Sequence, residues 1–303
     1  MEPTTAQQPM IHARDLSKRY GRTQAVAELG LAVESGQICG LLGPNGAGKT
    51  STMRMLVGLS SPDTGSARIL GRPVGLGARV LRRVGVLIDG PAFVPHLSGT
   101  ANLKLLWSAT GRAWPPPALD DALDLAGLGT AIARKVKGYS MGMRQRLALA
   151  QALMRAPDVL ILDEPANGLD PAEVRALREH LGALAGRGAA VLVSSHQLAE
   201  VQRLATHVVV MNHGRLITAG PLADLLDDTS TYVIKVDDGE RAAAVLRRMA
   251  GAAGITARGG EVTVAAPRVP SRDLVRALVT AGIGVTSVQQ LSRSLEEAFL
   301  TMT

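Results

Sequence analysis

Cysteine, aromatic residues and long apolar runs are all scarce in this 303-residue sequence. The single cysteine, Cys39, excludes an intramolecular disulfide framework, and its apolar neighbours predict a small buried residue rather than a nucleophile. This cysteine usage suits a reducing compartment such as the cytosol. Aromatic residues make up only 2% of the chain, so the sequence offers no cluster of rings on which bases or sugars would stack.

Segments that would direct the chain to a membrane are also missing. The first ten residues, MEPTTAQQPM, contain no basic segment followed by an apolar one, so we expect no signal peptide. Spanning a bilayer takes about 20 mostly apolar residues. The apolar runs here are short and are interrupted by charges or glycines. We therefore expect any association with a membrane to depend on a partner.

The charge balance leaves three interpretations open. A net charge of +7 and an isoelectric point of about 10.1 are compatible with nucleic acid, with an anionic membrane surface, or with an arginine-rich solvated face. The third is the commonest, and no block of five consecutive basic residues occurs; Arg82-Arg83, for example, is a pair in mixed sequence. Charge alone does not decide between the three.

The pattern of apolar residues predicts a large α/β domain, residues 1–228, and a small α+β domain, residues 229–303. In the first, short strands near residues 10–42 precede a helix at 49–59, and residues 91–157 form a mainly helical insertion. Apolar runs typical of a parallel sheet that is buried on both faces occur at 38–42, 159–163, 190–194 and 207–211.

The smaller domain has the order βαββαβ, which is typical of a split βαβ module. Its strands are expected at 231–236, 255–258, 261–265 and 285–291, and its helices at 240–249, 271–280 and 294–303.

A phosphate-binding loop follows the strand at 38–42. The pattern G-x-x-x-x-G-K-[ST] is matched in full by Gly43, Pro44, Asn45, Gly46, Ala47, Gly48, Lys49 and Thr50, with Ser51 next. Backbone N–H groups of such a loop surround a β-phosphate, while Lys49 reaches the β- and γ-oxygens and the Thr50 hydroxyl can bind Mg²⁺. The alternative is a glycine turn beside a solvated lysine. It is disfavoured because a strand and a helix flank the loop.

Two adjacent carboxylates, Asp163 and Glu164, end the apolar strand at 159–163. Asp163 can hold Mg²⁺ through water, while Glu164 points to the other side and is placed to polarise the attacking water as a general base. Alone, the pair could equally be a strand end with solvated acids. Beside an intact phosphate loop, it predicts a site that hydrolyses a nucleotide.

The segment Tyr139-Ser140-Met141-Gly142-Met143 precedes that strand by one amphipathic helix. It resembles the LSGGQ signature of ABC ATPases, and the chain is similar to this family over roughly residues 10–220. The resemblance implies ATP as the nucleotide, a parallel-sheet core and an antiparallel N-terminal β subdomain. It also implies that Ser140 and Gly142 contact the γ-phosphate of ATP bound to a second subunit. Two copies would then dimerise to complete two sites.

Three more residues stand at positions of the family pattern. Asp170, within residues 167–171, resembles the D-loop residue that lies at the dimer seam. His196 resembles the switch histidine that contacts the γ-phosphate. Tyr20 is placed like the aromatic residue that stacks on adenine, with simple packing as the alternative. The other histidines lack metal-ligand spacing.

Departures from the family pattern indicate a branch. Asp89 stands where most members carry Gln; it can accept a hydrogen bond or bind Mg²⁺ but cannot donate, and we consider it a third cation ligand beside Thr50 and Asp163. An acidic residue here and Met143 at the end of the signature resemble the bacitracin and lantibiotic exporter branch. The carboxy-terminal module, which ends with residues 294–300, resembles accessory domains of drug-export ATPases.

We therefore predict an ATPase with Glu164, His196 and Lys49 in catalysis. The resemblance implies a peripheral subunit at the cytoplasmic face of the membrane that pairs with a second ATPase subunit and a separate permease to export an antibiotic, peptide or drug. The alternative is a soluble ABC ATPase that acts on ribosomes or nucleic acid. A single phosphate loop and the lack of sustained heptads disfavour it, so we expect no nucleic-acid partner. Ser140 and His196 disfavour a nucleoside kinase or GTPase.

Overall fold

The computed structural model describes residues 8–226, 231–249, 253–266, 269–291 and 295–302. The chain divides into two compact units, Met1–Gly220 and Pro221–Thr303. The boundary expected from the sequence, at residues 228–229, lies outside the described residues, as does Ser294 at the start of the expected last helix. No helix of the described part has both the length and the apolar character that crossing a membrane requires.

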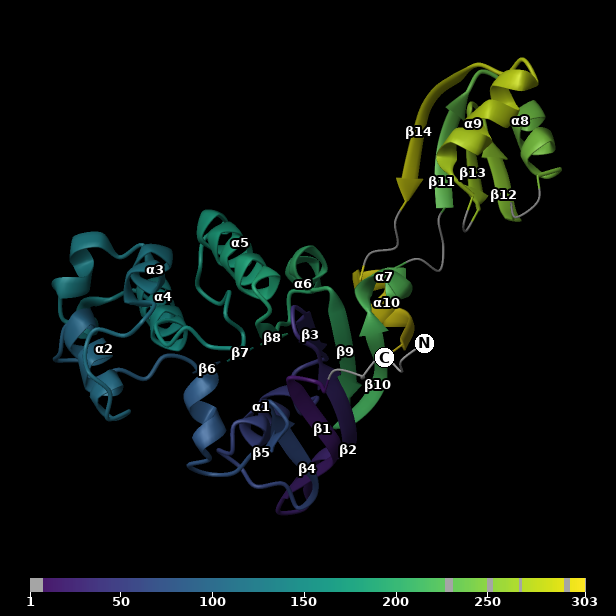
Figure 1. Ribbon diagram of the computed structural model, residues 1–303. Coiled ribbons are helices and arrows are strands. Elements are labelled where there is room, and N and C mark those ends of the chain that lie inside the picture. Colours follow the sequence, from purple (N-terminus) through teal and green to yellow (C-terminus); the bar gives the residue numbers. More distant parts are fainter. Residues whose placement is uncertain (1–7, 227–230, 250–252, 267–268, 292–294, 303) are drawn as a thin grey trace, which may run out of the picture. The chain divides into compact units, whose positions relative to one another are not determined.

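The N-terminal unit contains two sheets (Figure 1). The smaller one has the order β2-β1-β4-β5 and antiparallel pairing; its strands are β1 Ile11–Tyr20, β2 Thr23–Val33, β4 Thr64–Ile69 and β5 Arg72–Pro73. The larger one has the order β10-β9-β3-β8-β7-β6; its strands are β3 Ile38–Leu42, β6 Val84–Leu87, β7 Val159–Leu162, β8 Ala190–Ser194, β9 His207–Asn212 and β10 Arg215–Pro221. Parallel pairing joins β6, β7, β8, β3 and β9. The expected α/β fold is confirmed.

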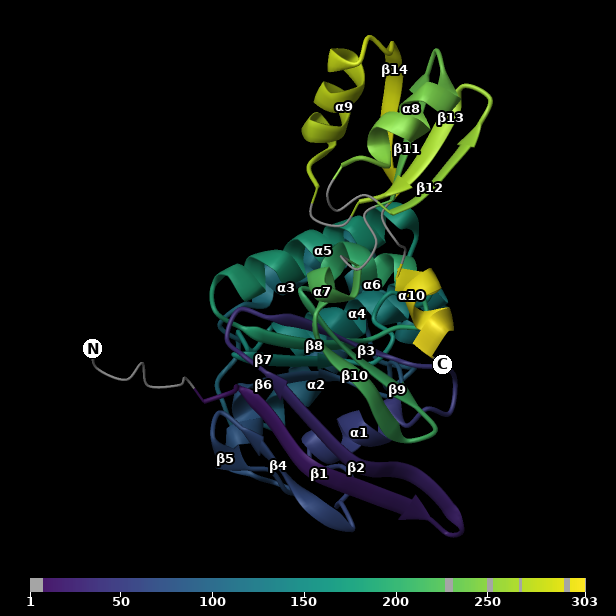
Figure 2. The same cartoon turned by 90° about the vertical axis from the view of Figure 1, so that its right-hand side faces the viewer.

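Helices cover both faces of the larger sheet. They are α1 Lys49–Leu56, α2 Gly99–Ser108, α3 Leu119–Ala126, α4 Met141–Leu153, α5 Pro171–Gly186 and α6 Leu198–Leu204, with the short 3-10 helices η1 Arg79–Arg83, η2 Gly129–Ala133 and η3 Val136–Gly138. Figure 2 shows α1 between the larger sheet and strands β1, β2 and β4, with α5 and α6 on the sheet's other face. The predicted helical insertion corresponds to α2, α3 and α4.

Alternating residues of the buried strands enter two separate cores. In β7, Leu160 and Leu162 pack with the helices of the insertion, while Val159 and Ile161 pack with α1 and the smaller sheet. All four side chains are buried because successive residues of a strand point to opposite faces. This explains the continuous apolar run, which is typical of a strand covered on both sides.

Helix α1 ends at Leu56, three residues before the end expected from its periodicity. Gly58 has a φ of +72°, and the N–H of Leu59 bonds to the carbonyl of Arg54 at 2.9 Å. A glycine in the left-handed conformation ends a helix in this way because it has no Cβ to clash. The chain therefore turns away before Leu59.

Neighbouring strands bring distant loops together. In the order β3-β8-β7, the phosphate loop follows β3, Asp163 follows β7 and His196 lies two residues beyond β8. The carboxyl ends of parallel strands meet at one edge of a sheet. The three segments therefore meet there.

The C-terminal unit contains an antiparallel sheet of order β12-β13-β11-β14. Its elements are α7 Leu222–Leu226, β11 Thr231–Val236, α8 Gly239–Leu246, β12 Ala253–Arg258, β13 Glu261–Ala265, α9 Ser271–Thr280, β14 Val285–Leu291 and α10 Leu295–Met302. Buried residues of this unit, such as Ile234, Leu246 and Leu274, form its own core. The βαββαβ order predicted from the sequence is present within it.

Candidate functional site

The phosphate loop owes its path to residues without side chains. Gly48 has a φ of +102°, and a Cβ there would collide with the carbonyl oxygen of Ala25. Lys49 follows at the start of α1, and its ammonium donates to the carbonyls of Gly43 at 2.6 Å and Pro44 at 3.2 Å. The loop thus folds back over the lysine that it carries.

Lys49 is 7% exposed, and burial lowers the pKa of its ammonium, although the charges of Glu164 and Asp163 act in the opposite direction. The two carboxylates therefore face the same space as the lysine. A charged group that is costly to bury is stabilised by anionic ligands, so this arrangement favours binding of phosphate.

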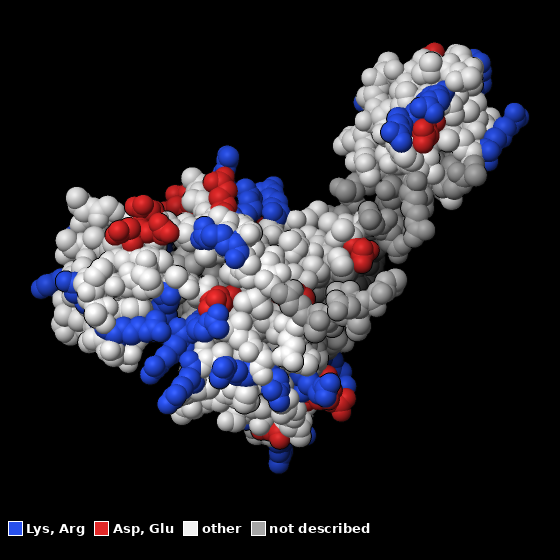
Figure 3. All heavy atoms as spheres, viewed as in Figure 1, with Lys and Arg blue, Asp and Glu red and all other residues white. Residues whose placement is uncertain are grey.

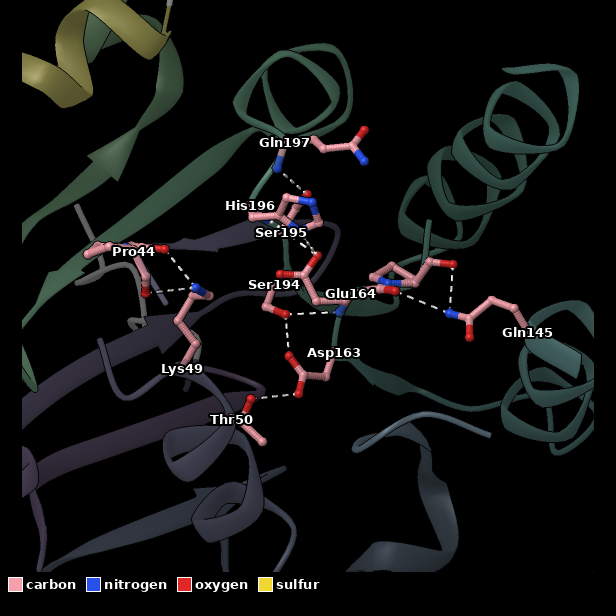
Figure 4. A network of polar contacts seen from close by, with 12 residues as sticks. Pro44, Lys49, Thr50, Gln145, Asp163, Glu164, Ser194, Ser195, His196 and Gln197 are labelled. Atoms are coloured by element: carbon pink, nitrogen blue, oxygen red, sulfur yellow. Dashed lines mark hydrogen bonds and ion pairs between the residues drawn. The ribbon is translucent and has the colours of Figure 1, made fainter. Parts of the chain in front are cut away.

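Asp163 links the loop to the neighbouring strand (Figure 4). One of its oxygens accepts from the Thr50 hydroxyl at 2.7 Å, and the other accepts from the Ser194 hydroxyl. The Ser194 oxygen in turn accepts from the backbone N–H of Glu164 at 3.0 Å. The serine, at the end of β8, thereby holds both acidic residues that follow the adjacent strand β7.

Glu164 points away from Asp163, as the sequence predicted, and faces His196. Its Oε2 lies 2.7 Å from the imidazole Nδ1, and Figure 4 shows the two side chains in contact. Glu164 has a φ of +49°, which is unusual for a residue with a side chain. Gln145 of α4 secures this turn, because its amide donates to the carbonyls of Glu164 at 3.1 Å and Pro165 at 2.9 Å.

A cavity of about 390 Å³ lies in front of these groups. It is lined by Thr23, Gln24, Ala25, residues 45–51, Asp163 and Glu164. The ligand set of Thr50 and Asp163 consists of a hydroxyl and a carboxylate, which are oxygen donors of the kind that Mg²⁺ prefers. The residues present therefore fit both a phosphorylated ligand and its magnesium ion.

Tyr20 lies outside the lining of this cavity. Its ring is 44% exposed, and the ammonium of Lys18 lies 5.8 Å from the ring centre. Its hydroxyl lies 3.4 Å from the hydroxyl of Ser60, and this contact lowers the pKa of the phenol. An exposed ring is available for stacking, and the role of Tyr20 stays a prediction.

Asp89 has a partner that the sequence did not suggest. Arg54 of α1 donates to both of its carboxylate oxygens, at 2.6 Å and 2.9 Å. This bidentate contact raises the pKa of the guanidinium. Asp89 is therefore held by an arginine here, whereas Thr50 and Asp163 hold each other. Its role as a third cation ligand stays a prediction.

The signature residues Ser140 and Gly142 and the D-loop residue Asp170 are likewise not part of the cavity's lining. Ser140 begins α4 and accepts from the N–H of Met143 at 3.2 Å, and a Cβ on Gly142 would lie 2.5 Å from the carbonyl of Gly168. Asp170 begins α5, where its carboxylate accepts two backbone N–H groups. The segment at the start of α4 and the loop that precedes α5 therefore touch at Gly142 and Gly168.

Sequence reasoning missed Ser194, Gln145 and Arg54 as parts of the site. The sequence carries no local signal for Ser194, because its place opposite Asp163 depends on the parallel pairing of β8 with β7, in which Leu162 is opposite Val193. Gln145 stands in the run Arg144-Gln145-Arg146 directly after the signature, but nothing local shows which carbonyls it reaches.

Comparison with known proteins agrees with this geometry. The family model for the ABC transporter matches residues 26–167. An ABC transporter ATP-binding protein, YhcH of Bacillus subtilis, is 36% identical over 97% of this chain and 96% of its own length. The bacitracin transport ATP-binding protein BcrA of Enterococcus faecalis is 33% identical over 96% of this chain and 95% of its own length. The daunorubicin/doxorubicin resistance ATP-binding protein DrrA of Streptomyces peucetius is 35% identical over 100% and 93%.

Solved structures agree as well. The ATP-binding subunit of an ABC transporter superposes with a TM-score of 0.66 at 28% identity, covering 71% of this chain and 91% of that one. The dimeric cassette MJ0796 superposes with a TM-score of 0.64 at 21% identity, covering 70% and 99%, which shows a common fold. With relatives aligned over nearly the whole chain and the nucleotide site assembled from the matching segments, this protein belongs to the ABC transporter family, among its ATP-binding subunits.

Proposed function

We propose that this chain hydrolyses ATP to drive export of an antibiotic, peptide or drug through a separate permease. The observation that carries the proposal is the contact of 2.7 Å between Glu164 and His196, beside the phosphate loop and on the far side of Asp163. This contact supports Glu164 as the group that polarises an attacking water, with its carboxylate held by a second polar residue.

The residues of the loop would hold the nucleotide. Residues 45–51 line the cavity, and backbone N–H groups of this loop and of the start of α1 would bind the phosphates. Lys49 would exchange its carbonyl partners for phosphate oxygens, which relieves the cost of its burial. When bound, Mg²⁺ supplies charge neutralisation between the phosphates, and Thr50 and Asp163 would hold it.

Glu164 would act as the general base and accept a proton from water. His196 would orient this carboxylate through Nδ1 and face the γ-phosphate with its other ring nitrogen. Ser194 and Gln145 would keep Glu164 in its strained backbone conformation, because each fixes a different backbone group of that residue.

A second ATPase subunit would complete the site. Ser140 and Gly142 lie outside the cavity that Lys49 lines, and Met141 between them is 66% exposed at the beginning of α4. An exposed helix start with a serine hydroxyl suits a phosphate presented from another molecule. Asp170, in the adjoining loop, would then lie at the seam between two copies.

The proposed class of transported substrate is supported by relatives. BcrA is a bacitracin transport protein and DrrA a daunorubicin/doxorubicin resistance protein, and both align with this chain over almost its full length. As an ATP-binding subunit of this family, the chain would drive export through a membrane-spanning partner. We therefore place the chain at the cytoplasmic face of the membrane, attached to a permease.

Replacing the base tests the proposal. Glu164→Gln should retain ATP binding, lower the hydrolysis rate by about 10²- to 10⁴-fold, and accumulate an ATP-bound dimer that size-exclusion chromatography detects. The matched control is Glu179→Gln on α5, which removes an exposed carboxylate paired only with Arg175. Unchanged turnover in Glu164→Gln would remove the base assignment, and equal losses in both variants would show a general effect on folding.

A further inference from the structure

One stretch of the N-terminal unit carries charge of a single sign. Residues 64–88 contain five arginines and no acidic residue. The five are Arg68, Arg72, Arg79, Arg82 and Arg83, all exposed. Among the described residues, only Arg83 of this set forms an ion pair, with Asp158 at 2.6 Å. Figure 3 shows blue side chains gathering over the part of the unit that Figure 1 labels β5 and along the approach to β6.

Three of these arginines surround a shallow cavity of about 340 Å³. Arg72 comes from β5, and Arg79 and Arg83 come from the two ends of η1; Leu70 and Val80 form the rest of the lining. Guanidinium groups bind phosphate oxygens through paired N–H donors. Arg83 is held by Asp158, whereas Arg72 and Arg79 form no ion pair among the described residues, so the cavity offers two guanidinium groups that fit a phosphate group.

Two exposed leucines lie on adjoining loops, one of them within this stretch. Leu76, between Gly75 and Gly77 on the loop from β5 to η1, is 90% exposed, and Leu59 is 62% exposed. Their loops touch, since a Cβ built on Gly58 would lie 2.7 Å from the carbonyl carbon of Gly75. Single exposed leucines are common on protein surfaces. Two on adjoining loops, on a surface that also carries exposed arginines, supply the apolar and basic side chains that interfacial membrane binding uses.

We propose that this surface binds the headgroup of an anionic phospholipid, with the phosphate in the cavity of Arg72, Arg79 and Arg83 and with Leu76 and Leu59 inserted at the boundary of the acyl chains. The proposal goes beyond the proposed function, because the ATPase chain would itself contact lipid in the absence of a permease. It also assigns a role to the positive charge that the sequence left undecided.

The composition of the surface favours lipid over nucleic acid. Residues 58–83 contain no aromatic side chain on which a base would stack. Exposed leucines add nothing to contacts with a phosphodiester backbone, whereas they gain free energy by leaving water for the acyl region.

Vesicle flotation of the full chain, without a permease, tests the proposal. The chain should float with vesicles of phosphatidylglycerol and phosphatidylcholine and remain unbound with phosphatidylcholine alone. Each arginine near such a surface is worth about a factor of five in affinity, so Arg72→Gln with Arg79→Gln should weaken binding about 30-fold. Leu76→Ser should weaken it about tenfold. The matched control, Arg247→Gln with Arg248→Gln, removes the same charge from exposed positions on the C-terminal unit and should bind like the parent.

Several results would overturn the proposal. Equal losses in the control would show that net charge alone drives binding, and equal flotation with neutral vesicles would exclude the headgroup. Calorimetry with glycerol 3-phosphate provides a separate measurement. Binding of that ester without flotation would assign the cavity to a soluble phosphate compound, and retention of the chain on RNA through the same arginines, again without flotation, would assign it to nucleic acid. Thermal unfolding of each variant should match the parent, because all the changed side chains are exposed.

Discussion

Replacing Ser194 by alanine should test the hydrogen-bond relay behind the site. This serine is fully buried, with 0% exposure, at the end of β8. Its hydroxyl donates to the carboxylate of Asp163 and accepts from the N–H of Glu164 at 3.0 Å. Alanine keeps the backbone and nearly the same volume, so the change isolates the two hydrogen bonds.

The cost follows from what each partner retains. Leaving the N–H of Glu164 without its acceptor costs about 1–3 kcal/mol, and losing a hydrogen bond to a charged acceptor costs about 1.5–3 kcal/mol. Asp163 keeps its contact with Thr50 at 2.7 Å, so its loss should lie at the low end of that range. We expect Ser194→Ala to lower the free energy of unfolding by about 3 kcal/mol in total.

Urea unfolding followed by tryptophan fluorescence measures this loss of unfolding free energy in the N-terminal unit, which contains Ser194. The chain has two tryptophans, Trp107 and Trp114, and both belong to the N-terminal unit. The matched control is Ser195→Ala. This serine is the next residue in the chain and is also buried, but among the described residues its hydroxyl accepts only from the N–H of Gln197, at 2.9 Å. The control should lose about 1 kcal/mol. If Ser194→Ala lowers the free energy of unfolding no more than Ser195→Ala does, the hydrogen bonds of Ser194 do not stabilise the unit as expected.

Four further outcomes are expected. Tyr20→Ala should weaken ATP binding about tenfold and Tyr20→Trp should preserve it, as measured with a fluorescent nucleotide, because the exposed ring would stack on adenine; equal affinity of the alanine variant would assign the ring to packing. Lys49→Met should abolish ATP binding yet raise the free energy of unfolding of the nucleotide-free protein at pH 7. Burial lowers the pKa of Lys49, so between that pKa and the ordinary value of 10.5 the unfolded parent binds more protons than the folded parent. The free energy of unfolding of the parent therefore rises with pH in this range, and the advantage of the variant over the parent should shrink. An advantage that grows with pH would contradict this sign. Cys39, 1% exposed and with its pKa raised by burial to about 12, should react with a thiol reagent at pH 8 only after unfolding, and fast labelling of the native protein would contradict its burial. Asp89→Ala should raise the Mg²⁺ concentration needed for half-maximal ATPase activity and Arg54→Ala should lower it, because the arginine occupies both oxygens of the proposed ligand; no shift in either variant would remove Asp89 from the ligand set.

Local chemistry determined much of this protein from its sequence. The phosphate loop is predictable because glycine alone tolerates its backbone, and Gly48 does have the left-handed φ that the pattern implies. The buried strands are predictable because both of their faces enter a core, which requires a continuous apolar run such as residues 159–162. The split βαβ unit was also visible, since its periodicities and turns are local.

Other features depended on which distant segments come together. Arg54 and Asp89 are 35 positions apart in the sequence. Their ion pair requires the end of α1 to lie beside the turn after β6. The relay through Ser194 depends on β8 lying between β3 and β7, and the contact between the loops of Leu59 and Leu76 depends on how α1 packs against the smaller sheet. Strand order and helix packing arise from the burial of whole faces rather than from any single residue. These partners therefore became visible only in the tertiary structure.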